Sequence, residues 1–176
     1  DLTHPDLAPN LWTNPADPPN GVDDDHNGFV DDVHGADYAN EDAVPTDDAG
    51  HGSHVAGIIG AKGNNATGVA GLNWDAKIMA LKFLDADGSG NTADAANAID
   101  YAVTHGARVI NASWGGPAFS QALYQAIRRA ADKGVDFVAA AGIEVLAGVK
   151  VACIGPVTSA TARELGIDVA IQAREF

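Results

Sequence analysis

The sequence predicts an α/β fold, in which helices cover both faces of a mostly parallel sheet to give three layers. From residue 54 onward, short apolar segments typical of buried strands alternate with segments of helical periodicity, and short Gly turns separate them. Hydrophobic residues make up 46% of the 176 residues, and no apolar stretch is long enough to cross a bilayer. The chain is therefore long and apolar enough to form one globular core of ordinary size.

The expected elements follow one another in a regular order. Residues 8–48 are expected to be loops, because Pro and Gly punctuate them and hydrophobic periodicity is weak. Residues 92–106 have the clearest helical spacing, with a Gly stop at their end. The order is a helix at 54–61, a strand at 77–84, a helix at 92–106, a strand at 108–116, a helix at 120–134, a strand at 135–142, a strand at 149–156, a helix at 158–166 and a strand at 167–173.

Charge excludes one class of partner. The formal net charge is -14, and residues 1–61 contain no Lys or Arg. Phosphate binding requires the opposite sign, so nucleic acid is not an expected partner. An N-terminal third rich in Asp, Asn and Gly suggests calcium instead, because clustered carboxylates repel one another unless cations or solvent relieve them. The single cysteine, Cys153, excludes an internal disulfide.

The stretch GHGSHVAG holds two histidines, His51 and His54, three residues apart. On a helix they could face one way and bind a metal, but HExxH is absent and a zinc site needs a further ligand. The alternatives are a catalytic base or a helix-entry residue at His51, with His54 packed against the core. The motif alone leaves His51 open between these roles.

The surrounding motifs resemble the subtilisin-like serine peptidases (subtilases) from Asp1 to about Gly142. The matching stretches are HPDL, GHGSHVAGIIGA, GVAGLNWDAKIMALKFLDADGSG, AIDYAVTHGARVINASWGG and GVDFVAAAG. The resemblance implies a serine endopeptidase that acts on peptides or proteins, with His51 as the general base and His54 in a structural role. It also implies secretion, although no signal segment stands at the start of this sequence. Ser113, Trp114 and Gly115 would then bind the extended backbone of the substrate.

Three elements that the family's chemistry requires do not occur in the sequence. The resemblance places the Asp-Thr-Gly element before HPDL, and the sequence begins too late to contain it. Ile143 stands where the family has the Asn that stabilises the oxyanion, and no Gly-Thr-Ser element occurs. The only late serine is Ser159, which lacks a matching context. We therefore expect this polypeptide to be inactive alone.

Two calcium sites are expected. The motif DDDHNG places Asp23, Asp25 and Asn27 at positions 1, 3 and 5 of a loop like the start of an EF-hand, although His34 replaces the final Glu. A solvated acidic loop is the alternative. The family resemblance implies a second site, in the HPDL element and the loop GNNATGV: Asp6 and Asn65 would bind through their side chains, and Thr67 and Val69 through their carbonyls.

The resemblance stops near Val145, and the tail resembles the end of a uroporphyrinogen-III synthase through its IGPVT turn and a helix ending in Glu-Leu-Gly. This suggests a chimera of a peptidase segment, 1–142, and a strand-helix-strand unit, 143–176, packed on the same sheet. A plain strand-turn-helix that completes the sheet is the alternative.

These observations predict a subtilase segment without a complete catalytic triad. The rival functions are a non-catalytic module that binds calcium or peptides, and an assembly of recombined fragments without activity. No nucleic acid or membrane partner is expected. A sheet edge left uncovered could associate with a second copy of the chain.

Overall fold

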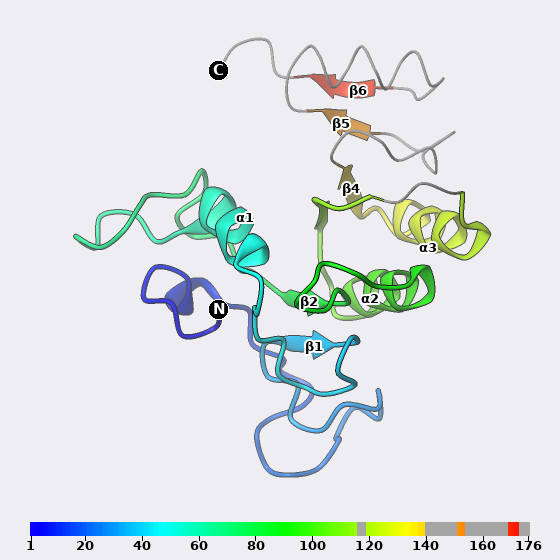
Figure 1. Ribbon diagram of the computed structural model, residues 1–176, viewed down its shortest axis with the longest axis horizontal. Helices are drawn as coiled ribbons and strands as arrows, with labels where there is room; N and C mark the ends of the chain where they lie inside the picture. Colours follow the sequence, from blue (N-terminus) through cyan, green and yellow to red (C-terminus); the bar gives the residue numbers. More distant parts are fainter. Residues whose placement is uncertain (116–118, 140–150, 154–168, 173–176) are drawn as a thin grey trace. The chain divides into compact units, whose positions relative to one another are not determined.

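A computed structural model describes residues 1–115, 119–139, 151–153 and 169–172. The chain divides into two compact units, Asp1–Asp94 and Ala95–Phe176. Figure 1 shows the elements and their order along the chain. Parallel strands and helices confirm the expected α/β class. Among the described residues, no helix has the length and apolarity that a bilayer crossing requires.

The first unit contains a short 3-10 helix, a two-stranded parallel sheet and one α-helix. The elements are η1 (Ala8–Asn10), β1 (Gly35–Asp37), α1 (His51–Gly60) and β2 (Ala80–Lys82). In the register of the sheet, Gly35 pairs with Ala80 and Asp37 with Lys82. Gly35 has φ +129, and a Cβ there would lie 1.8 Å from the Ala80 carbonyl oxygen. A glycine is therefore required where the two backbones approach.

Strand β1 was not expected, because residues 8–48 have a loop-like sequence. Its three residues carry no apolar run: Gly35 and Asp37 flank the fully buried Ala36. Its partner β2 lies 45 residues further along the chain in register, as the pairing of Asp37 with Lys82 shows. The expected strand at 77–84 is confirmed in type but is shorter, with isolated bridges at Ile78 and Leu84.

Helix α1 differs from expectation at its start and in its burial. It begins at His51, three residues before the expected start, because Gly50 adopts the left-handed conformation with φ 80 and the chain turns there. Only Gly60 is buried in it, and Ile58 is 60% exposed. His54 is also exposed, so the expectation that it packs against the core is wrong for this structure.

The second unit contains a four-stranded parallel sheet in the order β3-β4-β5-β6. Its elements are α2 (Thr92–Thr104, which begins in the first unit), β3 (Val109–Ala112), α3 (Gln121–Asp132), β4 (Asp136–Ala139), β5 (Val151–Cys153) and β6 (Val169–Gln172). The strands that end the chain thus belong to the same sheet as β3 and β4. The expected helix at 158–166 and the expected junction at 142–146 lie outside the described residues.

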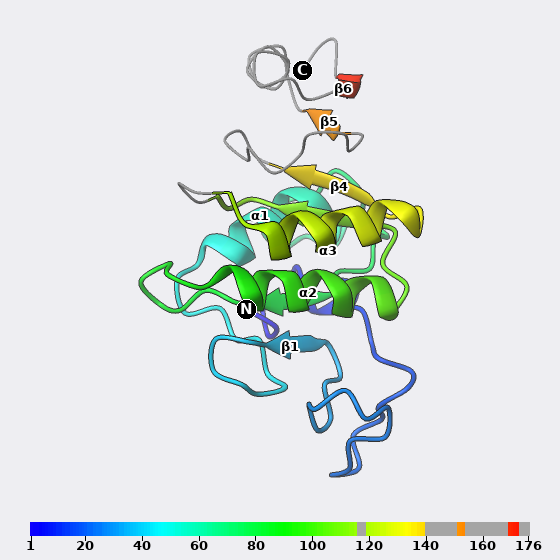
Figure 2. The same ribbon diagram turned by 90° about the vertical axis from the view of Figure 1, so that its right-hand side faces the viewer.

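The core of the second unit forms where α3 packs on β4. Leu123, Ala126, Ile127 and Ala130 form the apolar stripe of α3 at helical spacing, and all are buried. Ser120 caps the helix by accepting a hydrogen bond from the backbone N–H of Leu123 at 3.3 Å. Figure 2 shows α2 beside α3. The Arg129 guanidinium joins them by two bonds to the Asp100 carboxylate, at 3.0 and 2.5 Å.

Replacement of Phe137 by Ala is expected to lower the free energy of unfolding by about 3 to 5 kcal/mol, because the ring is 1% exposed and its loss leaves a cavity. Urea denaturation followed by circular dichroism measures the change. Phe119→Ala is the matched control, since that ring is 54% exposed, and it should cost less than about 1 kcal/mol. Equal losses in the two variants would contradict this description of the core.

Candidate functional site

His51 stands at the first position of α1, and its side chain is exposed. No other described residue hydrogen-bonds its ring. Gly50 before it turns the chain in the left-handed conformation, so the ring projects from the start of the helix rather than from its middle. The ring nitrogens are therefore accessible from solvent.

Asp47 fixes the backbone on both sides of His51. Its Oδ1 accepts hydrogen bonds from the N–H groups of Ala49 at 3.1 Å and Gly50 at 2.7 Å. Its Oδ2 accepts one from the N–H of Ser53 at 2.7 Å, which satisfies one of the free donors of the first turn. Partial burial opposes ionisation, yet the bonds from Ser53, Gly50 and Ala49 hold the pKa of Asp47 well below its usual value.

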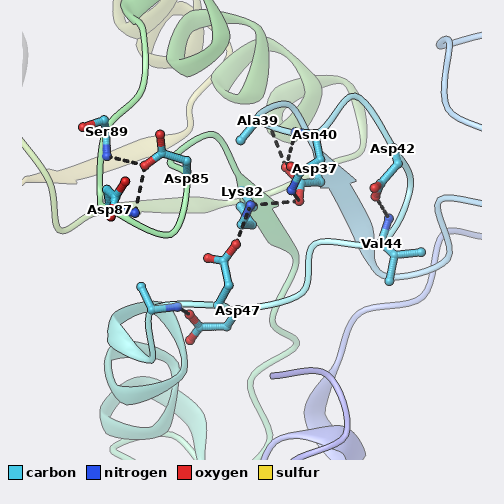
Figure 3. A network of polar contacts seen from close by, with 12 residues as sticks. Asp37, Ala39, Asn40, Asp42, Val44, Asp47, Lys82, Asp85, Asp87 and Ser89 are labelled. Carbon is cyan, nitrogen blue, oxygen red and sulfur yellow. Dashed lines mark hydrogen bonds and ion pairs between the residues drawn. The ribbon is translucent and has the colours of Figure 1, made fainter.

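Lys82 lies between two carboxylates, one on β1 and one in the segment that precedes this helix. Its Nζ is 3.1 Å from Asp37 Oδ2 and 3.5 Å from Asp48 Oδ2. Figure 3 shows Lys82 directed at Asp37, with Asp47 at the start of the helix. Burial disfavours the ammonium, but the carboxylates of Asp37 and then Asp48, which pair with it, raise the pKa of Lys82 above its usual value. The lysine therefore remains charged although its side chain is only 10% exposed.

The sequence did not single out Lys82, Asp37, Asp47 or Asp48. Asp47 and Asp48 precede the histidine motif directly, and a pair of carboxylates before a helix start was a detectable signal for a helix cap. The pairing of Lys82 with Asp37 had no such signal, because it depends on the register of two short strands distant in the sequence.

The expected calcium ligands at Asp6 lie together. Asp6 is 1% exposed, and its Oδ1 accepts a hydrogen bond from Asn65 Nδ2 at 2.7 Å. Its Oδ2 accepts one from the N–H of Val69, also at 2.7 Å. The bonds from Asn65 and then Val69 lower the pKa of Asp6. Thr67 lies in the same loop and donates its N–H to Asn65 Oδ1 at 3.2 Å.

The donor chemistry of this loop fits a hard cation. A cradle closes around Asp6, since a Cβ on Gly68 would lie 2.1 Å from Asp6 Oδ2. Asp6 and Asn65 offer one carboxylate and one amide oxygen, and calcium takes both kinds of ligand. A half-turn of the Asn65 amide would exchange its nitrogen for its oxygen on the side that faces Asp6, and such orientations are assigned from hydrogen bonding.

In the Asp-rich turn, residues 23–28, backbone N–H groups of the turn donate to its own Asp side chains. Asp23 accepts from the N–H groups of Asn27 at 3.1 Å and Gly28 at 3.0 Å, and Asp25 accepts from Asn27 at 3.2 Å. No helix occurs between residues 12 and 34, all of which are described, so the loop is not an EF-hand. Asp31, further along the same loop, accepts from the backbone N–H groups of Asn20 and Gly21.

Two buried side chains that the sequence did not single out complete this turn. Asn14 donates from Nδ2 to Asp25 Oδ2 at 3.1 Å and to Asp32 Oδ1 at 2.6 Å. Asn27 donates to the other oxygen of Asp32 at 2.7 Å. Asn14 and Asp32 are 2% and 0% exposed. The motif spacing gave no signal for Asn14 or Asp32.

Ser113, Trp114 and Gly115 follow strand β3 in the second unit. Ser113 and Trp114 are half-buried, and Gly115 is exposed. Asn111 Nδ2 donates to Ser113 Oγ at 2.9 Å. Within the described part of the sheet, β3 pairs with β4 alone, so it is a terminal strand.

Comparison with known proteins identifies relatives over most of the chain. The family model described as "Subtilase family" matches residues 1–159. Subtilisin-like protease 1 of Plasmodium berghei (strain Anka) is 39% identical over 140 residues, which cover 78% of this chain and 23% of that protein. Thermitase of Thermoactinomyces vulgaris is 46% identical over 110 residues, covering 62% of this chain and 39% of that protein.

A solved structure supports the same relationship. Fervidolysin from Fervidobacterium pennivorans, a keratinolytic enzyme related to subtilisin, superposes with a TM-score of 0.66 at 26% identity over 88% of this chain and 23% of that chain. The chain thus spans about a quarter to two fifths of the length of these relatives. The family match continues beyond the junction expected at residues 142–146, so an origin of the tail in uroporphyrinogen-III synthase is not supported.

Replacement of Asp47 by Ala is expected to lower the free energy of unfolding by about 1 to 2 kcal/mol at pH 7, because three backbone N–H groups lose their acceptor. Since the pKa of Asp47 is lowered in the folded chain, its stabilisation is complete above about pH 4 and is lost as the pH falls further. Urea denaturation at a series of pH values measures both effects.

The difference between wild type and Asp47→Ala should therefore shrink below about pH 4. Asp42→Ala is the control, because Asp42 is exposed and its side chain accepts a single backbone bond, from Val44. A difference that stays constant down to the lowest pH at which the chain remains folded would contradict the ionised cap.

Proposed function

The chain belongs to the subtilase family, and from this premise we propose that it is the part of a serine endopeptidase that supplies the general base, His51. The observation that carries the proposal is the exposed imidazole at the first position of α1. The backbone on either side of it is held by the hydrogen bonds that Gly50 and Ser53 donate to the Asp47 carboxylate. A general base needs an accessible ring on a well-anchored backbone, and the exposed imidazole and the Asp47 hydrogen bonds support this role.

In the proposed mechanism, the His51 imidazole takes the proton from a serine hydroxyl as that oxygen attacks the peptide carbonyl. The imidazolium then gives the proton to the departing amine. The Asp element that would orient the ring and the Ser element that would attack do not occur among the 176 residues. The printed chain by itself is therefore inactive in this proposal.

The proposed substrate is a peptide or protein segment in extended conformation. It would lie along the segment that follows β3 and contact Ser113, Trp114 and Gly115 at the carboxyl end of that strand. The family also suggests that the protein acts outside the cell.

Calcium is the proposed structural cofactor. Asp6 and Asn65 would bind it through side-chain oxygens, with the carbonyls of Thr67 and Val69. A second ion would lie at Asp23, Asp25 and Asn27, where the buried Asp32 adds a further carboxylate. When bound, the ion supplies charge neutralisation and cross-links residues that are distant in the sequence.

A non-catalytic module that binds calcium or peptides is the second candidate. It is favoured by the closed loop around Asp6, in which Asn65 and Val69 donate to the buried carboxylate. An assembly of recombined fragments without activity has less support, because the family match continues to residue 159.

A fluorogenic peptide assay separates these functions. The printed chain should show no turnover above background, whereas a longer polypeptide that joins it to an Asp and a Ser element should hydrolyse the peptide. In that polypeptide, His51→Ala should lower kcat/KM by about 10⁴-fold or more, because a triad acts as a unit. His54→Ala, which changes the other histidine of the motif, is the control.

If the 176-residue chain hydrolyses the peptide and a serine-directed inhibitor blocks this turnover, its expected inactivity is refuted. A kcat/KM that His51→Ala leaves unchanged in the longer polypeptide would refute the role of the imidazole as base.

Calcium binding is tested by thermal melting. At about a hundredfold excess over its dissociation constant, calcium should stabilise the chain by about 2.7 kcal/mol, and magnesium should do so less. Asp6→Asn should remove the part of the stabilisation that arises at this loop. Asp75→Asn is the control, since its side chain is 87% exposed and pairs with Lys62. An equal rise in Tm for Asp6→Asn and wild type would exclude a site at Asp6.

A further inference from the structure

Lys82 reaches an acidic segment that has no lysine or arginine of its own. Residues 1–61 contain no Lys or Arg, although many carboxylates occur there. Lys82 reaches this acidic segment from β2, and its side chain is 10% exposed. It contacts Asp37, whose side chain is 2% exposed, and Asp48, whose side chain is 41% exposed.

We propose that Lys82 is a positioning residue for His51: its ammonium joins Asp48 to Asp37 and thereby fixes the segment from which α1 begins. The inference rests on the proposed role of His51 as a base. It adds a residue that acts on the ring through the backbone, without contact with substrate or reacting atoms.

The links from Lys82 to His51 are continuous within the first unit. Asp37 and Lys82 are register partners in the parallel pair of β1 and β2, so the strands hold this pair side by side. Asp37 is itself anchored, because its carboxylate accepts N–H bonds from Ala39 at 2.9 Å and Asn40 at 3.0 Å. The ammonium therefore has a rigid support on one side.

On its other side the ammonium attracts Asp48, which is adjacent in sequence to the helix cap Asp47. Asp47 bonds to the N–H groups of Gly50 and Ser53, which bracket His51. A shift of residues 47 and 48 would therefore move both anchors of the histidine backbone together. Gly50, in its left-handed conformation, adds no side chain that could hold the turn.

A purely stabilising ion pair makes a different prediction from a positioning one. Loss of a stabilising pair changes the free energy of unfolding and leaves the ring environment of the folded chain unchanged. Loss of a positioning contact changes the environment and mobility of the first turn in the folded state. Spectroscopy of the folded chain distinguishes the two roles.

The experiment uses the full printed chain and two nuclear magnetic resonance readouts. The first is the ¹H–¹³Cε1 resonance of His51, assigned with His51→Gln, and the second is hydrogen exchange at the Ser53 amide. Asp48→Asn and Lys82→Met should both shift the ring resonance and accelerate Ser53 exchange by about twofold to fivefold, the effect of losing a partly exposed ion pair. Lys82→Arg, which keeps the charge, should restore both readouts.

Lys62→Met is the matched control, because Lys62 pairs with the exposed Asp75 at 2.8 Å. It should change neither readout. If Lys82→Met fails to fold, Asp48→Asn decides, since Asp48 is partly exposed and its loss leaves the buried pair of Lys82 and Asp37 intact. An unshifted His51 resonance with unchanged Ser53 exchange in folded Asp48→Asn would overturn the proposal.

These readouts do not require catalysis. The proposal for Lys82 can therefore be refuted while the peptide assay still supports His51 as a base. It can also be supported while that assay refutes His51 as a base.

Discussion

The first unit depends on the charge of one buried lysine. An ammonium removed from water is costly unless carboxylates compensate it, and removal of one partner leaves an uncompensated charge. Lys82 lies 3.1 Å from Asp37 and 3.5 Å from Asp48, and its pKa remains raised despite burial. The same contacts hold β1 against β2 and fix the segment that precedes the histidine helix. Stability and the placement of His51 thus have a common physical cause.

The other buried carboxylates of this unit are stabilised without lysine or arginine. Asp6, Asp17 and Asp32 are at most 1% exposed, and backbone N–H groups and asparagine amides donate to them. Hydrogen bonds to the ionised form compensate in part for lost hydration. These donors explain how an acidic segment can be ordered without lysine or arginine beside each carboxylate.

Much of the fold could be predicted from the sequence, because its periodic segments are long or bounded by glycine. Helices α2 and α3 and strands β2, β3 and β4 lie within their expected ranges. Strand β1 could not be predicted, since Gly-Ala-Asp has no strand pattern and its partner is distant in the sequence. His51 was singled out by its motif, and its role as a base remains a proposal. Lys82 was missed because its importance arises from register and burial, and Asp32 because spacing in a loop does not fix which of two adjacent carboxylates turns inward.

A double-mutant cycle on Lys82→Met and Asp37→Asn tests the central claim most directly. The free energies of unfolding of the wild type, the two single variants and the double variant give the coupling between the charges. The buried pair predicts a coupling of about 1 to 3 kcal/mol, with the double variant more stable than the sum of the single losses implies. Losses that add to within about 0.3 kcal/mol would show that the lysine and the aspartate act independently, and would contradict the account.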